Sequence, residues 1–260
     1  MNISYSALDV FTKCPFSFKL KYVDKVPYDR GSIHTAFGSA VHKAIQLKLL
    51  DNSSDLEKSF KDAFKEELKN LPEKNKNKIL NEDKKLAEDM VAKGAYLCAL
   101  ALEHLNKTFP EFRLVDVEKV FIEPIIEYQQ NDYEMKGIID LIIQTTDGRY
   151  HIIDWKTCSW GWDAQKKSDK MTTYQLTYYK HYFCLQNNID VNLVDTHFAL
   201  IKRTAKKDNI EIFDVSVGQK KIGNALKVLN NMVHNVDHKN FPKNRLSCQY
   251  CEFYKSNWCP

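Results

Sequence analysis

Two acidic residues and a lysine near the middle of the chain have the types and spacing needed to hydrolyse a phosphodiester bond. Residues 137–157 read GIIDLIIQTTDGRYHIIDWKT and contain Asp140, Asp154 and Lys156. Side chains alternate along a strand, so Asp154 and Lys156 share a face. Carboxylate oxygens suit Mg²⁺ or Mn²⁺, which polarise a phosphate and lower the pKa of a bound water. The lysine would orient that water and offset charge in the transition state.

The loop between the two strands decides whether Asp140 joins Asp154. A two-residue turn at Asp147-Gly148 would pair Asp140 with Trp155 and put the two acids on opposite faces. A three-residue loop over 146–148 pairs Asp140 with Asp154 instead, and it needs a glycine in the left-handed conformation at its last position, where Gly148 stands. We therefore expect the three-residue loop, with both acids at the edge of a buried sheet.

The elements that must hold these residues change in type along the chain. Helical patterns are expected first, then strands with two further helices. The expected helices are 4–23, 32–50, one opened by a capping box at 54–57, 81–106, 168–186 and 218–234, with a polar connection over 74–85. The expected strands are 115–127, 133–145, 150–155, 191–202 and 210–215, the first three as a meander.

This order predicts an α/β fold. We expect a mixed central sheet flanked by helices, with an N-terminal helical cap and a C-terminal cysteine tail. The chain is interpreted as one domain, 1–260, composed of a helical part (1–110), a sheet core (111–217) and a helix with the tail (218–260).

Composition narrows the class of protein. Hydrophobic residues make up 43% and charged residues 28% of 260, as in ordinary soluble domains. No apolar run approaches the roughly 18 residues of a membrane helix, and the N-terminus does not resemble a secretory signal. We therefore expect a cytoplasmic protein without a membrane partner. Among 38 basic residues lysine dominates, which suits contact with phosphates without base readout. The same usage favours a phage or bacterial origin.

Five segments in a fixed order carry a family resemblance. They are SYSALDVFTKCPFSFKLKYV with Cys14-Pro15, FGSAVHKAI with His42, GIID, DWK, and YQLTYYKHY with Gln175 and Tyr179. Together they resemble the RecB-like branch of the PD-(D/E)xK nucleases. This branch includes nuclease domains of bacterial recombination helicase–nucleases, CRISPR-associated RecB-like exonucleases and related phage exonucleases. The resemblance implies a restriction-endonuclease-like core.

The resemblance also implies roles for individual residues. The metal ligands would be His42, Asp140, Asp154 and the main-chain carbonyl of Trp155, and Lys156 would be catalytic. Gln175 and Tyr179 would support the site or the DNA backbone, and they share a helical face because they are four apart. The second acid is Asp154 where many members have Glu. The nearby His34 is expected to be structural.

Four of the seven cysteines lie near the chain ends, at Cys14, Cys248, Cys251 and Cys259. Without an export signal, metal binding is favoured over disulfides. By residue type alone, structural zinc, an iron–sulfur cluster and a redox CxxC all stay open. The resemblance implies a structural [4Fe–4S] cluster that clamps the tail to the first helix, although the gap from Cys251 to Cys259 is longer than is usual. Cys98, Cys158 and Cys184 are expected to pack.

Aromatic and lysine residues after Lys156 indicate the substrate. Bases of a single strand stack on aromatic rings irrespective of sequence. Candidate contacts are Trp160, Trp162, Tyr179, Lys166 and Lys167. The leading hypothesis is a sequence-independent exonuclease acting on single-stranded DNA ends. No phosphate-binding loop of a helicase occurs, so a separate helicase or recombination protein would supply single strands. A structure-specific endonuclease, an inactive iron–sulfur DNA-binding module and an RNA substrate are the alternatives.

Overall fold

A computed structural model of the chain describes residues 1–28, 31–125 and 133–260. The first part is helical. Its elements are β1 (Asn2–Ser4), α1 (Tyr5–Lys13), α2 (Pro15–Phe18), the π-helix η1 (Lys19–Val23), α3 (Ile33–Leu50), α4 (Leu56–Asn70), α5 (Glu73–Asn81) and α6 (Lys84–Thr108). The second part contains β2 (Arg113–Pro124), β3 (Glu134–Gln144), β4 (Tyr150–Cys158), α7 (Ala164–Ser168), α8 (Lys170–Asn187), η3 (Val191–Leu193), β5 (Val194–Lys202), β6 (Ile210–Asp214), α9 (Gln219–Asp237) and η4 (Arg245–Tyr250).

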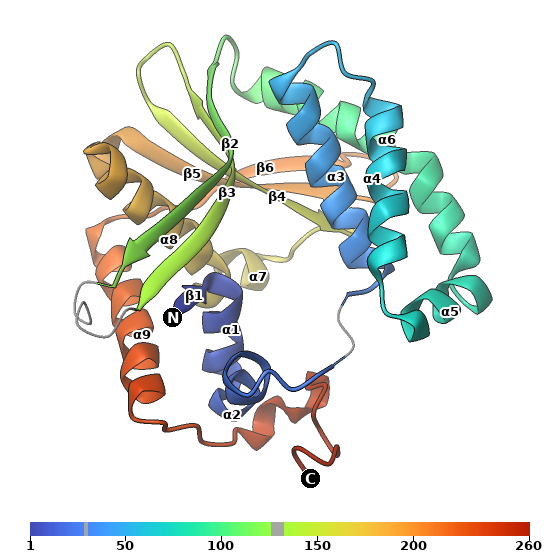
Figure 1. Cartoon of the computed structure of the whole chain (residues 1–260). Helices are drawn as coiled ribbons and strands as arrows, with labels where there is room; N and C mark the ends of the chain where they lie inside the picture. The colour runs from blue at the N-terminus through green and yellow to red at the C-terminus, as the bar shows by residue number, and fades with distance from the viewer. Residues whose placement is uncertain (29–30, 126–132) are drawn as a thin grey trace.

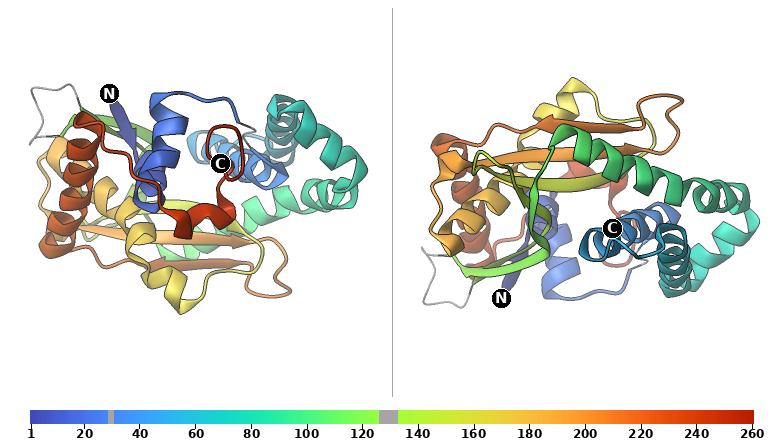
Figure 2. Two further views of the ribbon diagram at one scale, coloured as in Figure 1. Left: turned by 90° about the horizontal axis from the view of Figure 1, so that it is seen from below. Right: turned by 90° about the horizontal axis from the view of Figure 1, so that it is seen from above.

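The strands form one mixed sheet in the order β1-β3-β4-β5-β6, with β2 on the other edge of β3. The β2–β3, β3–β4 and β5–β6 pairs are antiparallel, whereas β4–β5 and β1–β3 are parallel. One core layer packs α1, α8 and α9 on the sheet, and a second packs α3, α4 and α6 on its other face. Figures 1 and 2 show these helices on either side of the strands. The expected α/β class, with a mixed sheet flanked by helices, is confirmed.

The β3–β4 hairpin has the expected three-residue loop. Leu141 pairs with Ile153 and Gln144 with Tyr150, so the ladder ends one residue before Asp140 and Asp154. The N–H of Gly148 donates to the Thr145 carbonyl at 2.9 Å. Gly148 has φ +84°, a conformation that glycine adopts without steric cost.

Three local expectations were wrong. The first helix is broken after Lys13, because Pro15 cannot continue it and instead begins α2. The polar connection over 74–85 contains helix α5, which has no buried residue and pairs Lys76 with Glu73. The capping box at 54–57 does not form. Asp55 caps α4 by accepting from the Lys58 N–H at 3.0 Å.

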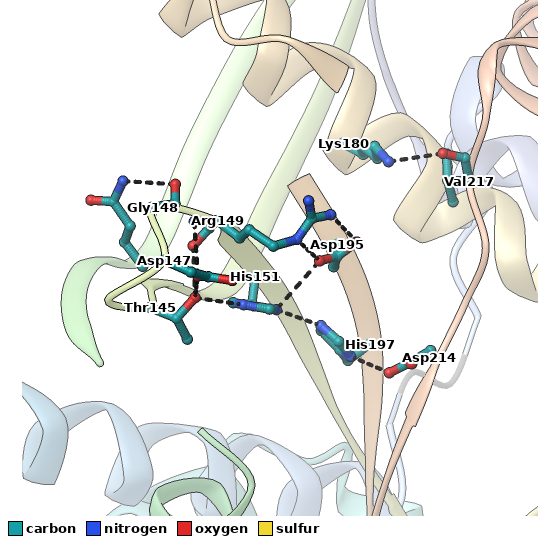
Figure 3. A network of polar contacts seen from close by, with 11 residues as sticks. Thr145, Asp147, Gly148, Arg149, His151, Lys180, Asp195, His197, Asp214 and Val217 are labelled. Atoms are coloured by element: carbon teal, nitrogen blue, oxygen red, sulfur yellow. Dashed lines mark hydrogen bonds and ion pairs between the residues drawn. The ribbon is translucent and has the colours of Figure 1, made fainter. Parts of the chain in front are cut away.

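A polar network connects the start of β4 and of β5 with the end of β6 (Figure 3). Arg149 donates two hydrogen bonds to Asp195, at 2.7 and 2.8 Å. The rings of His151 and His197 share a hydrogen bond of 3.0 Å, and His197 contacts Asp214 at 2.8 Å. Burial lowers the pKa of both histidines, so the pair is held neutral and serves to align the three strands.

Within the described residues, none of the helices combines the length and the apolar character needed to span a bilayer.

Candidate active site

The site begins at a gap along one edge of β3. β1 pairs with residues 134–136 on this edge and β4 with residues 141–144. Among the strands that the structure describes, none pairs on this edge with the four residues between them, which end at Asp140. The Asp140 carboxylate fills the end of this gap by accepting a hydrogen bond from the Trp155 N–H at 2.8 Å. The fork between β3 and β4 is thus closed by a side chain instead of by a ladder bond.

Two further side chains reach Asp140. His42 extends from α3, and its Nδ1 lies 3.5 Å from Asp140 Oδ2. Glu118 lies on β2, at the position between Val117 and Lys119, which pair with Leu141 and Ile139. One ligand atom from each of His42, Glu118 and Asp140 lies within 4.8 Å of the others. Two carboxylates and an imidazole in this arrangement suit a divalent cation.

Glu118 is a candidate that the sequence reasoning missed. Its φ of +53° is unusual for a residue with a side chain, and the β2–β3 register shifts between Leu114 and Asp116. The signal in the sequence was an acid on the strand before the GIID segment. Without knowledge of that register shift, the acid that faces Asp140 could not be chosen.

The second half of the site lies on β4 and α8. The Nζ atom of Lys156 lies 2.6 Å from Asp154 Oδ2. The Gln175 amide donates to Asp154 Oδ1 and to the Tyr179 hydroxyl oxygen, both at 2.9 Å. Gln175 and Tyr179 share a face of α8, as their spacing predicted. The structure thus brings together four of the residues that the sequence predicted.

One oxygen of Asp154 stands out. The side chain is 1% exposed. Its Oδ2 atom lies 2.6 Å from the Lys156 ammonium, which compensates its charge. Asp140 and Glu118 bring further carboxylates to the site, next to the His42 imidazole. Carboxylate oxygens with an imidazole are a donor set that fits a divalent metal ion.

The charges of the site are coupled. Burial raises the pKa of Asp154, and the nearby Asp140 carboxylate adds to this although Lys156 opposes it. Burial disfavours the charged form of Lys156, but Asp154 and Asp140 outweigh it and raise the pKa of the ammonium. The same balance, led by Asp140, raises the pKa of His42. Burial, with Asp140, also raises the pKa of Glu118. The metal-free pocket therefore retains protons that a cation would displace.

The comparisons with known proteins decide the family. The family model described as the PD-(D/E)XK nuclease superfamily matches residues 2–260. The chain belongs to the PD-(D/E)XK nuclease superfamily. A search of curated proteins found no match.

Solved structures agree at the level of the fold. A structure from Eubacterium rectale, described as a candidate exonuclease, is 13% identical with a TM-score of 0.62, covering 98% of this chain and 88% of that chain. A second structure, of SSO0001, is 15% identical, covers 92% of this chain and 91% of that chain, and has a TM-score of only 0.39.

The predicted metal ligands are only partly grouped. His42 and Asp140 belong to the compact set with Glu118, whereas Asp154 lies outside it and contacts Lys156 and Gln175. The role of the Trp155 carbonyl stays a prediction, since the contact that connects Trp155 to the site runs through its N–H.

The four predicted cluster cysteines line one cavity of about 430 Å³, measured with its open mouth. Its apolar walls include Phe16, Leu20 and Phe253. The tail returns to α1 and α2 here (Figure 2), and the Asn244 amide donates to the Lys13 carbonyl at 2.8 Å. The Asn244 N–H approaches Cys14 Sγ at 3.4 Å. Across the described residues, no three cysteine sulfurs lie within 4.8 Å of one another.

The side chains predicted to contact nucleic acid differ in their exposure and in the partners that they already have. Trp160 is 80% exposed. Trp162 packs on Phe198 with ring centroids 5.1 Å apart, and Lys166 lies over its ring. Lys167 pairs with Glu211, and Tyr179 is buried. Among the aromatic candidates, Trp160 therefore has the ring surface that a base needs for stacking.

Proposed function

We propose that this chain hydrolyses phosphodiester bonds in DNA with Mg²⁺ or Mn²⁺, as a sequence-independent exonuclease acting on single-stranded ends. The observation that carries the proposal is the position of Lys156, 2.6 Å from a buried Asp154 oxygen, beside the His42, Glu118 and Asp140 group. An ammonium and several carboxylates around one point suit attack on a phosphate.

Each residue of the site would have a separate role in the reaction. His42, Glu118 and Asp140 would hold the cation, with Asp154 as a further ligand, and the cation would supply Lewis acidity and an acidified water. Lys156 stays protonated, because the two aspartates raise its pKa. It therefore acts as a fixed charge that orients water and offsets phosphate charge, and not as a general base. Gln175 holds Asp154 in place.

Tyr179 would contact the strand. Burial raises the pKa of its hydroxyl, which stays protonated. Its oxygen already accepts from Gln175, so the phenolic proton is available to a phosphate oxygen. With DNA as the substrate, the protein would act in the bacterial or phage-infected cytoplasm, after a separate helicase or recombination protein has opened the duplex.

Digestion of end-labelled DNA tests the proposal. Wild type, Lys156→Ala and the control Lys58→Ala, an exposed lysine on α4, are compared on single-stranded, double-stranded and circular single-stranded DNA and on RNA, with Mg²⁺ or Mn²⁺. We expect metal-dependent shortening from an end by wild type and control, and none by Lys156→Ala. Cutting of circles would identify an endonuclease. No cleavage of any substrate by folded protein would favour an inactive binding module.

We also propose that Cys14, Cys248, Cys251 and Cys259 hold a [4Fe–4S] cluster that ties the tail to α1 and α2. Four thiolates around one cavity support this. A tetrahedral zinc site with Zn–S distances of about 2.3 Å would need sulfurs roughly 4 Å apart, and this spacing is not met by any three of the described sulfurs.

The cluster proposal is tested by metal content. Wild type purified without oxygen is expected to contain iron and acid-labile sulfide. It should also absorb at about 400 nm, from the Fe–S charge-transfer bands. Cys248→Ser and Cys251→Ser should lose iron and melt earlier, whereas the packing variant Cys184→Ala should retain iron. Zinc in place of iron, or unchanged iron in the serine variants, would contradict the proposal.

A further inference from the structure

A second pocket lies beside the end of β4. It has a volume of about 520 Å³ with its open mouth included, and its lining combines polar His34, Thr157, Ser159 and Arg203 with apolar Phe37 and Met90. Nothing in the proposed hydrolysis uses these residues. The pocket is nevertheless close to the catalytic groups, because Thr157 follows Lys156 directly on β4.

Helix α3 connects this pocket to the metal group. His34 and His42 are eight residues apart on α3, about 12 Å along the axis. Between them, Gly38 faces Thr157, whose Oγ1 would lie 3.0 Å from a Cβ at that position. Figure 1 shows the end of β4 beside α3. A strand bound at the metal group therefore needs roughly two to four nucleotides to reach the pocket, given a rise of about 3.4 Å per nucleotide in duplex DNA.

The charge of the pocket favours an anion. Arg203 is 8% exposed and donates through Nη1 to Asp89 Oδ2 at 3.2 Å. Lys93 occupies the other oxygen of the same carboxylate at 2.7 Å. Two cations share one acid, which leaves about one positive charge beside the pocket. Among the described residues Arg203 has no other side-chain hydrogen bond, and its remaining N–H groups are not sealed from solvent.

The donors match one chemical group. An arginine fork binds phosphate oxygens in pairs, and two hydroxyls and an imidazole complete the wall. The pocket also lies at the N-terminal turn of α3, an 18-residue helix whose dipole favours anions. Trp160, next to Ser159, is 80% exposed and offers a ring on which the neighbouring base can stack.

We propose that this pocket binds a backbone phosphate of the substrate strand, two to four nucleotides from the bond that is cut. The proposal rests on the nuclease function proposed above and adds a positioning site to it. A phosphate held here, together with one at the metal group, fixes the register of a strand without reading its bases.

The test uses the full-length protein and single-stranded oligonucleotides with one uncharged methylphosphonate linkage, moved stepwise from the first cleavage position. In wild type, a linkage at one position two to four nucleotides away should raise KM. The double variant Thr157→Val/Ser159→Ala should raise KM for unmodified DNA on the order of tenfold, from two lost hydrogen bonds, and should no longer respond to that linkage. Its kcat should stay unchanged.

Two controls keep the result interpretable. Ser53→Ala removes an exposed hydroxyl on the α3–α4 connection and should behave as wild type. Arg203→Lys preserves the ion pair with Asp89 but loses the fork, and should raise KM with an unchanged melting temperature. If wild type cleaves DNA but the double variant has the wild-type KM, the phosphate pocket is wrong and the nuclease proposal stands. If wild type cleaves no nucleic acid with either metal, both proposals fail.

Discussion

The Asp140 carboxylate accepts a hydrogen bond from the Trp155 N–H at 2.8 Å, across the fork where β3 leaves β4. Asp140 therefore has two roles, because the same Oδ2 atom also lies 3.5 Å from His42 Nδ1. One task is to satisfy a backbone donor at the end of a ladder, and the other is to offer negative charge to a cation. A substitution can separate them.

Asp140→Asn should abolish cleavage while leaving the fold intact. An amide oxygen can still accept from the Trp155 N–H, but it brings no charge to the cation. We expect kcat to fall by at least about 100-fold, as for removal of a strong electrostatic group, with little change in melting temperature. Asp140→Ala should also lose stability, by about 1–3 kcal/mol, since the Trp155 N–H is then unpaired. Cleavage rates and denaturant unfolding of both variants check this. Equal stability of the two would contradict the capping role.

Glu118→Gln should weaken metal binding and leave the fold unchanged. Glu118 contributes one of three clustered ligand atoms, and loss of one ligand charge should reduce Mn²⁺ affinity by about 10- to 100-fold. The matched control is Asp116→Asn on the same strand, which pairs with Lys119 and lies outside the group. Titration calorimetry with Mn²⁺ measures both variants. Wild-type affinity in Glu118→Gln would remove Glu118 from the site.

The metal-free protein should become less stable as Asp154 ionises. Burial raises the pKa of Asp154 from 3.8 to about 6, so the folded state binds its proton more tightly than the unfolded state does. This contribution to stability is complete below pH 3.8 and is lost as the pH rises towards 6. Asp154→Asn removes the ionisation, and should stabilise metal-free protein by about 1–3 kcal/mol at pH 8 but not at pH 4.

Melting of both proteins in a chelator between pH 4 and pH 8 checks this expectation. Metal binding should weaken below about pH 6 for the same reason, because the cation must then displace the proton of Asp154. A constant difference in melting temperature between wild type and Asp154→Asn over this range would show that the Asp154 pKa is ordinary.

The β3–β4 hairpin that carries the candidate acids could be predicted because its determinants are local. Gly148 at the last loop position selects the three-residue loop, and that loop sets the register in which Leu141, next to Asp140, pairs with Ile153, next to Asp154. The resemblance supplied Gln175 and Tyr179, and helical spacing predicted that they share one face of α8. The order of the family segments predicted His42. It lies too far from Asp140 in the sequence for a local pattern to connect the two residues.

Features that depend on contacts between distant segments could not be predicted. The position of Glu118 depends on a register shift in β2 and on the left-handed backbone conformation of Glu118 itself. The phosphate pocket needs α3, α6 and the end of β5 to meet. Helix α5 was missed because its residues carry no buried face that would mark it.

Packing between α4 and α6 gives a prediction that runs against helix propensity. Alanine is a better helix former than glycine by about 1 kcal/mol, so Gly94→Ala in α6 would be expected to stabilise an isolated helix. In the protein, a Cβ at Gly94 would lie 2.0 Å from Phe60 Cζ, and Phe60 is fully buried against Phe37 and Phe64. We therefore expect Gly94→Ala to destabilise the fold by about 1–3 kcal/mol, as overpacking does.

The matched control for Gly94→Ala is Gly223→Ala in α9, where a new Cβ meets no atom within 4 Å. This variant should gain up to about 1 kcal/mol from helix propensity. Denaturant unfolding should give a lower free energy of unfolding for Gly94→Ala and a higher one for Gly223→Ala, each relative to wild type. A gain in stability for Gly94→Ala would mean that α4 moves away from α6 at little cost. Because α3, which carries His42, packs on both of these helices, such freedom would also loosen the metal group, so cleavage by Gly94→Ala should be measured alongside its stability.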